Sequence, residues 1–355
     1  MSQIGKKITR RGVLKGGAAL GLAGGALGGL ARPAAAADEV VYVNTWGGPW
    51  TAAEDAAFYK PFTAKTGIQV RPVSPVSYPK LKAQVDSGVY EWDCTNLDTA
   101  IFKQAQSNGL CEPIDWSVVD KSKLAPGVVV GDGIASVAYS TLLVYRKDKF
   151  PNGGPKSWAD FWDVKKFPGN RSLYNQAFTA LAFALLADGV PKDKLFPLDV
   201  NRAFKKLDEI KPHIKVWWTQ GGQSETLIKD AEVDMIGMWH GRAYSIIDQG
   251  VPLEVVWNGA ANNISYWMVA KGSPRAKLAW KFIDYTAQPE GQAEFASRMA
   301  YGPSNPKALA LVKPDQLPRL PTTEEHLKLG YVADADWLQA NLASINERFA
   351  QWLAG

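Results

Sequence analysis

The sequence predicts an α/β protein with two lobes, each built on a mainly parallel sheet. Apolar, strand-like segments alternate with segments of helical periodicity along most of the chain, and this alternation is typical of parallel sheets. Two β-rich segments, 135–145 and 264–270, interrupt the alternation and predict strands that cross between the lobes. The 318 residues after residue 37 also exceed the length that one hydrophobic core usually serves.

The first part of the chain supplies the elements of lobe one. Residues 40–46 are apolar and end at Gly47-Gly48-Pro49, which predicts a strand followed by a turn. The next segment, 51–65, carries apolar residues at helical spacing. The same criteria predict strands at 68–73, at 91–95 and near Leu110, and helices at 80–86 and 99–107.

Lobe two lies mainly between the two crossings. Ser157 to Asp160 resembles a capping box, residues 177–187 form an apolar helix, and residues 201–210 form an amphipathic helix that stops before Pro212. We expect a last helix at 336–353 to brace lobe two or the seam. The predicted division is 38–140 plus 268–310 for lobe one and 141–267 plus 311–355 for lobe two. Such a pair of lobes leaves a ligand cleft between them.

Residues 1–37 are predicted to be a twin-arginine-type signal peptide. Arg10 and Arg11 precede a short run of Gly, Ala and Leu and then the small-residue cleavage site at 34–37. The run is too short and too rich in glycine to span a membrane comfortably. Val13 stands where such signals usually have Phe, so a general secretory signal is the alternative. With no cysteine at the cleavage site to carry a lipid, we expect the mature protein to be free in the periplasm.

The basic excess of the chain belongs to that segment. The sequence has 40 Lys and Arg against 35 Asp and Glu, and residues 1–37 hold six of the basic residues and no acidic one. The remaining chain has no run of Lys or Arg longer than a pair and no apolar stretch near the roughly 18 residues of a membrane span. We therefore expect neither nucleic acid nor direct membrane insertion.

The chain has two cysteines, Cys94 and Cys111. In an oxidising compartment they predict one local, structural disulfide. The alternative is a pair of buried free thiols.

Five segments, in order along the chain, carry a resemblance to a known family: 62–70, 158–162, 237–244, 265–270 and 301–306. The chain resembles the extracellular solute-binding proteins of ABC importers, and within them the spermidine/putrescine-binding group. The resemblance implies a type II periplasmic binding fold, closure of two lobes over a small solute, and delivery to a membrane permease with its ATPase. It implies no cofactor, and we expect a monomer.

The resemblance also implies an aromatic ligand site. In polyamine binders, tryptophans and a tyrosine enclose the methylene chain of the ligand, and the matching residues here are Trp46, Trp239, Trp267 and Tyr301. Trp50 is a further candidate on the same first loop as Trp46. An amine over such rings gains about 0.5–2 kcal/mol per contact. The alternative for each residue is simple packing in the core.

The charged part of the site departs from the polyamine pattern. Gln176, Thr179 and Val269 stand where polyamine binders have acids. Asp98, just after a predicted strand, is a candidate for holding an ammonium group, with a helix N-cap as the alternative. Arg242 is a candidate for a ligand carboxylate, with a surface or interlobe salt bridge as the alternative. Gln176, at a helix start, is expected to assist an anionic group. A zwitterion such as a γ-amino acid, a betaine-like compound or an opine therefore fits better than a diamine.

Other classes of protein fit the sequence less well. The three histidines are too scattered for a metal site, and no dinucleotide-binding or nucleophile-elbow motif is present, which argues against an exported enzyme. The absence of a Tyr-Tyr pair argues against a ferric-ion binder. A sugar binder stays open, because Asn96, Gln176 and Asn263 offer amide groups.

Overall fold

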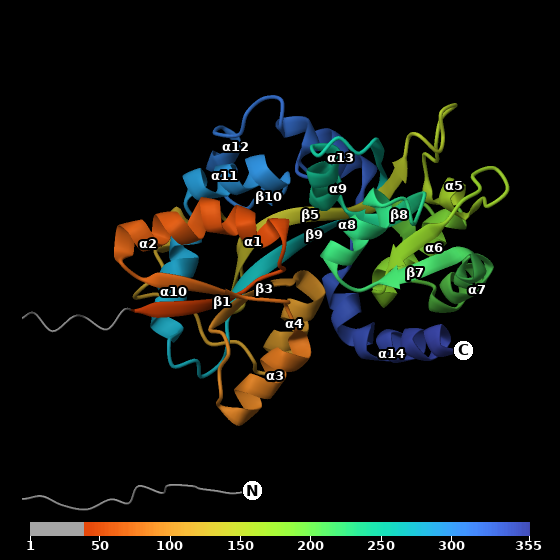
Figure 1. Cartoon of the computed structure of the whole chain (residues 1–355). Coiled ribbons are helices and arrows are strands. Elements are labelled where there is room, and N and C mark those ends of the chain that lie inside the picture. Colours follow the sequence, from red (N-terminus) through yellow and green to blue (C-terminus); the bar gives the residue numbers. More distant parts are fainter. Residues whose placement is uncertain (1–38) are drawn as a thin grey trace, which may run out of the picture. The chain divides into compact units, whose positions relative to one another are not determined.

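The computed structural model describes residues 39–355, which belong to one compact unit (Figure 1). The predicted signal peptide lies outside the described residues. The centre of the fold is a sheet of 11 strands. Its main path runs β2 (Gln69–Val73), β1 (Val40–Asn44), β3 (Cys94–Asp98), β9 (Leu253–Val269), β5 (Gly133–Arg146), β8 (Met235–Trp239), β6 (Arg171–Tyr174) and β7 (Ile214–Trp218). Three short strands complete it: β4 (Val129–Val130) and β10 (Gly302–Pro303) beside β5, and β11 (Tyr331–Val332) beside β9.

The two crossing strands lie at the middle of the sheet. β1 pairs in parallel with β2 and β3, and β6 pairs in parallel with β7 and β8. β5 and β9 are antiparallel to each other, β9 is antiparallel to β3, and β5 is antiparallel to β8. The α/β class and both crossings are therefore confirmed, although β9 begins earlier than the predicted segment 264–270. The exact division into lobes stays a prediction.

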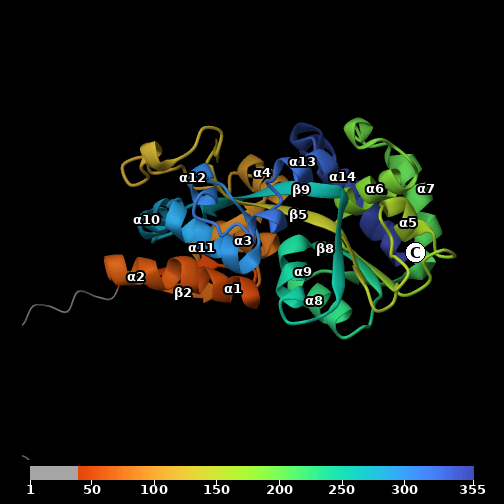
Figure 2. The same ribbon diagram turned by 90° about the horizontal axis from the view of Figure 1, so that it is seen from above.

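Helices of the first group surround β1, β2 and β3 (Figure 2). The predicted helix 51–65 is one helical segment, α1 (Pro49–Glu54), the π-helix η1 (Asp55–Tyr59) and α2 (Lys60–Thr66). The predicted strand 91–95 starts only at Cys94 and runs to Asp98. The other helices of this group are α3 (Tyr78–Ser87), α4 (Thr99–Ser107), α10 (Ala276–Thr286) and α11 (Pro289–Met299).

Helices of the second group surround β6, β7 and β8. Helix α7 buries the four residues that its periodicity predicts, Ala203, Phe204, Leu207 and Ile210. Within residues 39–355, no helix combines the length and the apolar character that a membrane crossing needs. The group comprises α5 (Trp158–Trp162), α6 (Ala177–Ala187), α7 (Val200–Ile210), α8 (Gly221–Lys229) and α9 (His240–Ile247), and the chain ends with α12 (Pro306–Leu309), α13 (Glu324–Leu329) and α14 (Ala335–Ala354).

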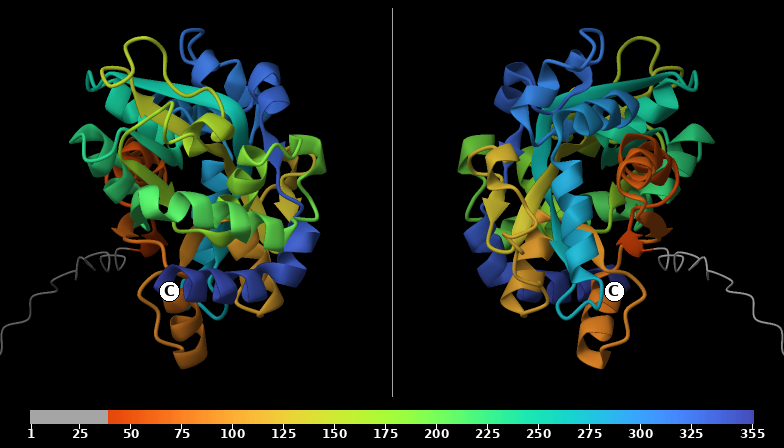
Figure 3. Two further views of the ribbon diagram at one scale, coloured as in Figure 1. Left: turned by 90° about the vertical axis from the view of Figure 1, so that its right-hand side faces the viewer. Right: turned by 90° about the vertical axis from the view of Figure 1, so that its left-hand side faces the viewer.

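The last helix connects the two groups. Figure 3 shows α14, in dark blue, along the lower part of the molecule in both views. It packs against both α4 and α6. Lys103 on α4 forms an ion pair with Asp336 at 2.8 Å, and the Gln339 side chain donates a hydrogen bond to Ser107. Helix α14 therefore packs against helices of both groups, and its position at a seam between two lobes stays a prediction.

The structure contradicts the predicted disulfide, because Cys94 and Cys111 are both free, buried thiols. Cys94 lies opposite Val269 on β9, whereas Cys111 lies opposite the next residue, Ala270. Successive residues of a strand point to opposite faces, so the two thiols belong to different hydrophobic clusters. Burial raises the pKa of both thiols, that of Cys111 to about 12.

Candidate ligand-binding site

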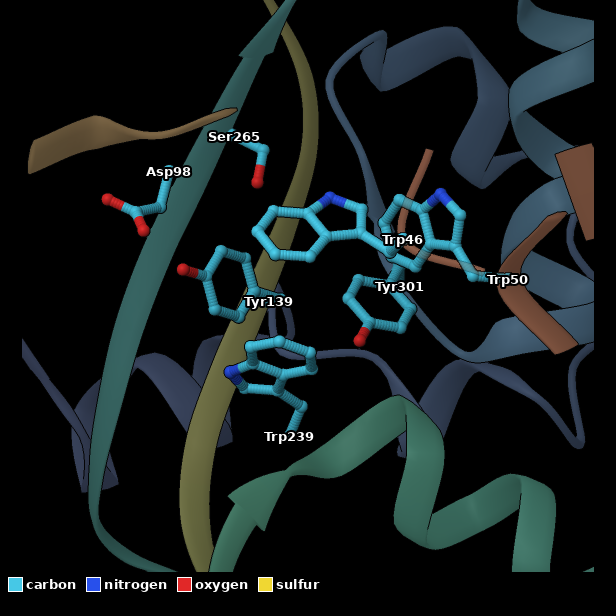
Figure 4. Close-up of a pocket in the computed structure, with 7 residues that line it drawn as sticks. All are labelled: Trp46, Trp50, Asp98, Tyr139, Trp239, Ser265 and Tyr301. Carbon is cyan, nitrogen blue, oxygen red and sulfur yellow. The ribbon is translucent and has the colours of Figure 1, made fainter. Parts of the chain in front are cut away.

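A small aromatic pocket lies beside the central strands. Three of the residues that line it end or follow strands of the sheet. Trp46 follows β1, Asp98 ends β3 and Trp239 ends β8. Ligands of α/β proteins usually bind at such strand ends. Figure 4 shows the whole lining set, which is Trp46, Trp50, Asp98, Tyr139, Trp239, Ser265 and Tyr301.

The turn between β1 and α1 carries two of the tryptophans. Gly47 and Gly48 have φ angles of 78° and 57°, values that residues with a Cβ atom rarely adopt. Pro49 then starts α1. This tight turn allows Trp46 and Trp50 to reach the same pocket from a loop and from a helix.

The aromatic rings meet edge to face around the pocket. The ring centroids of Trp46 and Trp239 are 5.5 Å apart at 74°, and those of Trp50 and Tyr301 are 4.7 Å apart at 87°. Tyr139 contributes a further edge contact to Trp239 at 6.4 Å. Such a group of ring faces provides the negative potential that attracts a cation.

Asp98 is the charged member of the pocket, and it is 5% exposed. Its Oδ1 accepts a hydrogen bond from the Ile101 N–H at 3.0 Å, so Asp98 is also the N-cap of α4. No ion pair within residues 39–355 involves Asp98. Burial raises the pKa of Asp98, while hydrogen bonds from the backbone of Ile101 and Ala100 and from the Gln176 side chain oppose this rise. The pocket thus holds a buried carboxyl group without a cationic partner, which is unfavourable unless something compensates its charge.

Tyr139 and Ser265 form a polar corner with Asp98. Ser265 lies opposite Asp98 in the β3–β9 pair. In Figure 4 the Tyr139 hydroxyl points to the side of the pocket on which Asp98 lies. Sequence reasoning missed both residues. Ser265 could have been found by pairing the second crossing strand with β3, whereas Tyr139 carries no such signal within β5.

Arg242 does not line the pocket. Its side chain is 1% exposed, and its Nη1 forms an ion pair with Glu225 at 2.6 Å. The guanidinium carbon lies 5.6 Å from the centroid of the Trp239 ring. The structure therefore shows a salt bridge, but a buried one between two residues of 141–267 and not the surface or interlobe bridge that we considered as the alternative. Two other nitrogens of Arg242, Nε and Nη2, are buried without a hydrogen-bond partner.

Trp267 and Gln176 also lie outside the aromatic pocket. Trp267 is buried in the core, with its ring centroid 5.7 Å from that of Phe282, so it does not line this pocket, and its role in ligand binding stays a prediction. It shares a sheet face with Ser265 but lies two residues further along β9, where α10 covers the sheet. Gln176, at the N-cap position of α6, lines a larger neighbouring pocket between α4, α6 and α14.

The ring of His240, the buried histidine next to Trp239, is held by the backbone on both sides. His240 Nδ1 accepts a hydrogen bond from the Ser140 N–H, and Nε2 lies 2.8 Å from the Ala300 carbonyl oxygen. Burial lowers the pKa of His240 to about 4, so the ring is neutral near pH 7. Among residues 39–355, no group of three or more His, Cys, Asp or Glu side chains is arranged to hold a metal ion.

Comparisons with known proteins agree with this architecture. The chain is 35% identical over 332 residues to the gamma-aminobutyric acid-binding protein of Pseudomonas aeruginosa, and the match covers 92% of this chain and 94% of the relative. It is 25% identical over 313 residues to the spermidine/putrescine-binding periplasmic protein of Escherichia coli, covering 83% and 86%.

A solved structure is similar over nearly the same range. The PBP AgtB from A. tumefaciens R10, in complex with agropinic acid, matches with a TM-score of 0.85 at 32% identity, over 89% of this chain and 99% of that one. The fold is therefore the type II periplasmic binding fold, and the relatives are solute-binding receptors rather than enzymes. Residues 57–322 match the model of the family described as bacterial extracellular solute-binding protein, and the chain belongs to that family.

Proposed function

We propose that this protein is a periplasmic receptor that captures a small amino-acid-like zwitterion and delivers it to an ABC permease and its ATPase. The proposal includes cleavage of residues 1–37 as a twin-arginine-type signal and a monomeric mature chain. It extends to this chain what the names of two similar proteins say of them, gamma-aminobutyric acid for one and agropinic acid for the other.

The observation that carries the proposal is Asp98, a buried carboxyl group without a cationic partner in an aromatic pocket. A ligand ammonium group compensates this charge and donates hydrogen bonds to Asp98. The hydroxyl oxygens of Tyr139 and Ser265 serve as further acceptors for its N–H groups. A free carboxylate in a dry pocket selects an amine over a neutral solute, because only the amine neutralises it.

The aromatic residues hold the rest of the amine-bearing end. Trp46, Trp50, Trp239 and Tyr301 present rings to the pocket, and each well-placed ring contributes about 0.5–2 kcal/mol to binding a cation. Gln176 takes a supporting role, because its hydrogen bond helps to keep Asp98 ionised.

We propose Arg242 for the carboxylate end of the ligand. Its Nη1 forms an ion pair with Glu225, whereas its Nε and Nη2 have no hydrogen-bond partner. These two nitrogens form the edge of a guanidinium group that can bind a carboxylate with two parallel hydrogen bonds. A Cβ atom at Gly221 would come within 2.2 Å of Nε, so only glycine fits this close to the guanidinium group at the start of α8. Because Arg242 adjoins the pocket through Trp239, binding there requires that the Trp239 ring shifts as the ligand enters.

The test compares ligands that carry one or both charges. We expect γ-aminobutyrate to bind in a calorimetric titration and to raise the melting temperature, since a ligand of the folded state stabilises it. Asp98→Asn should weaken this binding by about 10- to 100-fold, because a hydrogen bond to a charged group contributes about 1.5–3 kcal/mol. Asp199→Asn is the matched control, since Asp199 caps α7 in the same way and does not line the pocket.

Two outcomes would contradict the proposal. Binding of putrescine but not of γ-aminobutyrate would make the protein a polyamine receptor. Binding of a neutral sugar that Asp98→Asn leaves unchanged would make it a sugar receptor of the same fold. Butyrate lacks the amine, so it should bind neither to a zwitterion receptor nor to a polyamine receptor.

A further inference from the structure

A second buried carboxyl group lies behind the aromatic wall. Glu54 is 1% exposed, and it follows Trp50 by four residues on the same face of α1. Its Oε2 accepts hydrogen bonds from the Thr45 hydroxyl at 2.5 Å and from the Tyr59 hydroxyl at 2.6 Å. Thr45 is the neighbour of Trp46 in the chain. Glu54 therefore contacts Thr45, the residue before Trp46, and lies one helical turn after Trp50. It does not line the pocket itself.

No cation compensates Glu54 within the described residues. None of the ion pairs of residues 39–355 includes it. The groups that face it are Thr45, which follows β1, Trp50 from α1, Tyr59 from η1 and Cys94 from β3. Burial raises the pKa of Tyr59 and of Cys94 well above their usual values, so both are neutral near pH 7. Glu54 is thus the one group of this cluster whose charge changes near neutral pH.

The environment of Glu54 favours its neutral form when the pocket is empty. Burial raises the pKa of Glu54 to about 7, and the hydrogen bonds from Thr45 and Tyr59 limit this rise. A cation that enters a neighbouring site of low dielectric constant favours the ionised form of a carboxyl group. Because such linkage is reciprocal, ionised Glu54 in turn favours the bound cation.

We propose that Glu54 is a second, indirect counter-charge of the ligand site, and that it releases a proton when a cationic ligand enters the aromatic pocket. This inference rests on the proposed function, since it needs an ammonium ligand. In the step, the O–H bond of the Glu54 carboxyl group breaks, its electron pair stays on the carboxylate, and water in the solvent takes the proton. Thr45 and Thr51, whose hydroxyl oxygens are 3.0 Å apart, connect Glu54 with the partly exposed helix start.

The test measures proton release during binding. Calorimetric titrations of γ-aminobutyrate at pH 7 in phosphate and in Tris buffer give the number of protons released, because the two buffers differ in their heat of ionisation. We expect about half a proton per bound ligand, as a group with a pKa near the working pH is half protonated. The affinity should also rise several-fold from pH 6 to pH 8.

Two variants separate Glu54 from other groups. Glu54→Gln keeps the shape and the hydrogen-bonding capacity but has no proton to release, so its binding heat should not depend on the buffer. Asp55→Asn changes the next residue of the same helix, which is exposed and paired with Lys60, and it should release as many protons as the unchanged protein.

The ligand-free protein provides an independent measurement. Infrared difference spectra between pH 6 and pH 8 should contain the carbonyl stretch of a protonated carboxyl group, and this band should be missing in Glu54→Gln. Absence of the band in the unchanged protein would overturn the inference whatever binds. Binding heat that is the same in both buffers would overturn it while leaving the proposed function intact. If no amine binds at all, the proposed function fails and the coupling fails with it.

Discussion

Asp98 and Ser265 lie directly opposite each other in the antiparallel pair of β3 and β9. Asp98 is the last residue of β3, whereas Ser265 belongs to the long strand β9 in the middle of the sheet. Ser265 also pairs with Val137 of the other crossing strand, β5. A ligand bound to Asp98 and Ser265 therefore contacts both the end of a lobe-one strand and one of the two strands that connect the lobes.

The two roles of Asp98 can be separated by substitution. Asp98→Ala removes both the charge and the cap of α4, whereas Asp98→Asn removes only the charge, because Asn caps helices about as well as Asp. We expect Asp98→Ala to lower the free energy of unfolding by about 0.5–2 kcal/mol and Asp98→Asn to change it little. Both should weaken amine binding. Urea unfolding and calorimetry measure the two effects, and equal affinity for either variant and the unchanged protein would exclude Asp98 from the site.

Trp46 and Trp267 should respond in opposite ways to truncation. Trp46→Ala should weaken ligand binding with a modest loss of stability, because the ring is partly exposed at the pocket. Trp267→Ala should cost about 3–5 kcal/mol of unfolding free energy, because it leaves a cavity beside Phe282. Thermal melts and binding titrations of both variants test this. A Trp267→Phe variant that folds well and loses all affinity would restore Trp267 as a ligand contact.

Gly221 and Gly222 provide a matched pair for the carboxylate end of the ligand. A Cβ atom at Gly221 would clash with Arg242 and Trp239, whereas one at Gly222 meets nothing within 4 Å. Gly221→Ala should therefore weaken binding of γ-aminobutyrate by at least tenfold, and Gly222→Ala should leave it unchanged. The simple amine n-butylamine serves as the reference ligand. If Gly221→Ala weakens both ligands equally, the residue shapes the pocket rather than the carboxylate site.

His240 should make the protein less stable in mild acid. Its pKa is about 4 in the folded state against an ordinary value of 6.5, so the unfolded chain binds the proton more tightly. The stabilisation is complete above pH 6.5 and is lost as the pH falls towards 4, in total about 3 kcal/mol. Urea midpoints of the unchanged protein and of His240→Gln between pH 4 and pH 7 measure it. Parallel curves for the two proteins would contradict the assignment.

Glu54 should change the pH dependence of stability in the opposite direction. Its folded-state pKa of about 7 lies above the ordinary 4.5, so the folded state binds the proton more tightly. The stabilisation is complete below pH 4.5 and disappears as the pH rises through 7. Relative to Glu54→Gln, the ligand-free protein should therefore lose unfolding free energy between pH 5 and pH 8. A constant difference between the two proteins over this range would show that Glu54 does not change its charge.

Local signals were sufficient for the elements that they define. Helix α4 spans the predicted residues 99–107 because Asp98 caps its start, and α7 stops before Pro212 as its pattern indicates. The predicted strand 91–95 was displaced towards the N-terminus because β3 is defined by its partners β1 and β9, which no local pattern reveals.

The site was predictable where it follows strand ends and not where it depends on pairing. Trp46, Asp98 and Trp239 lie at strand ends, so position along the chain was informative. Ser265 lines the pocket and Trp267 is buried in the core, although both belong to β9. This difference depends on which helix covers each part of β9, and tertiary packing of this kind is not visible in the local sequence. Arg242 is turned into the protein by Glu225, four residues into α8, and the sequence does not connect these two helices.

The opening of two lobes that we predict would have a mechanical consequence for helix α14. Its apolar residues Leu338, Leu342, Ile345 and Phe349 are buried mainly among side chains of lobe two, whereas its polar links to α4 lie at the surface. Surface contacts of this kind break easily in water, while buried apolar contacts do not. The helix should therefore travel with the second lobe and slide over the first, and a pair of labels at Ser107 and Gln339 would follow each opening.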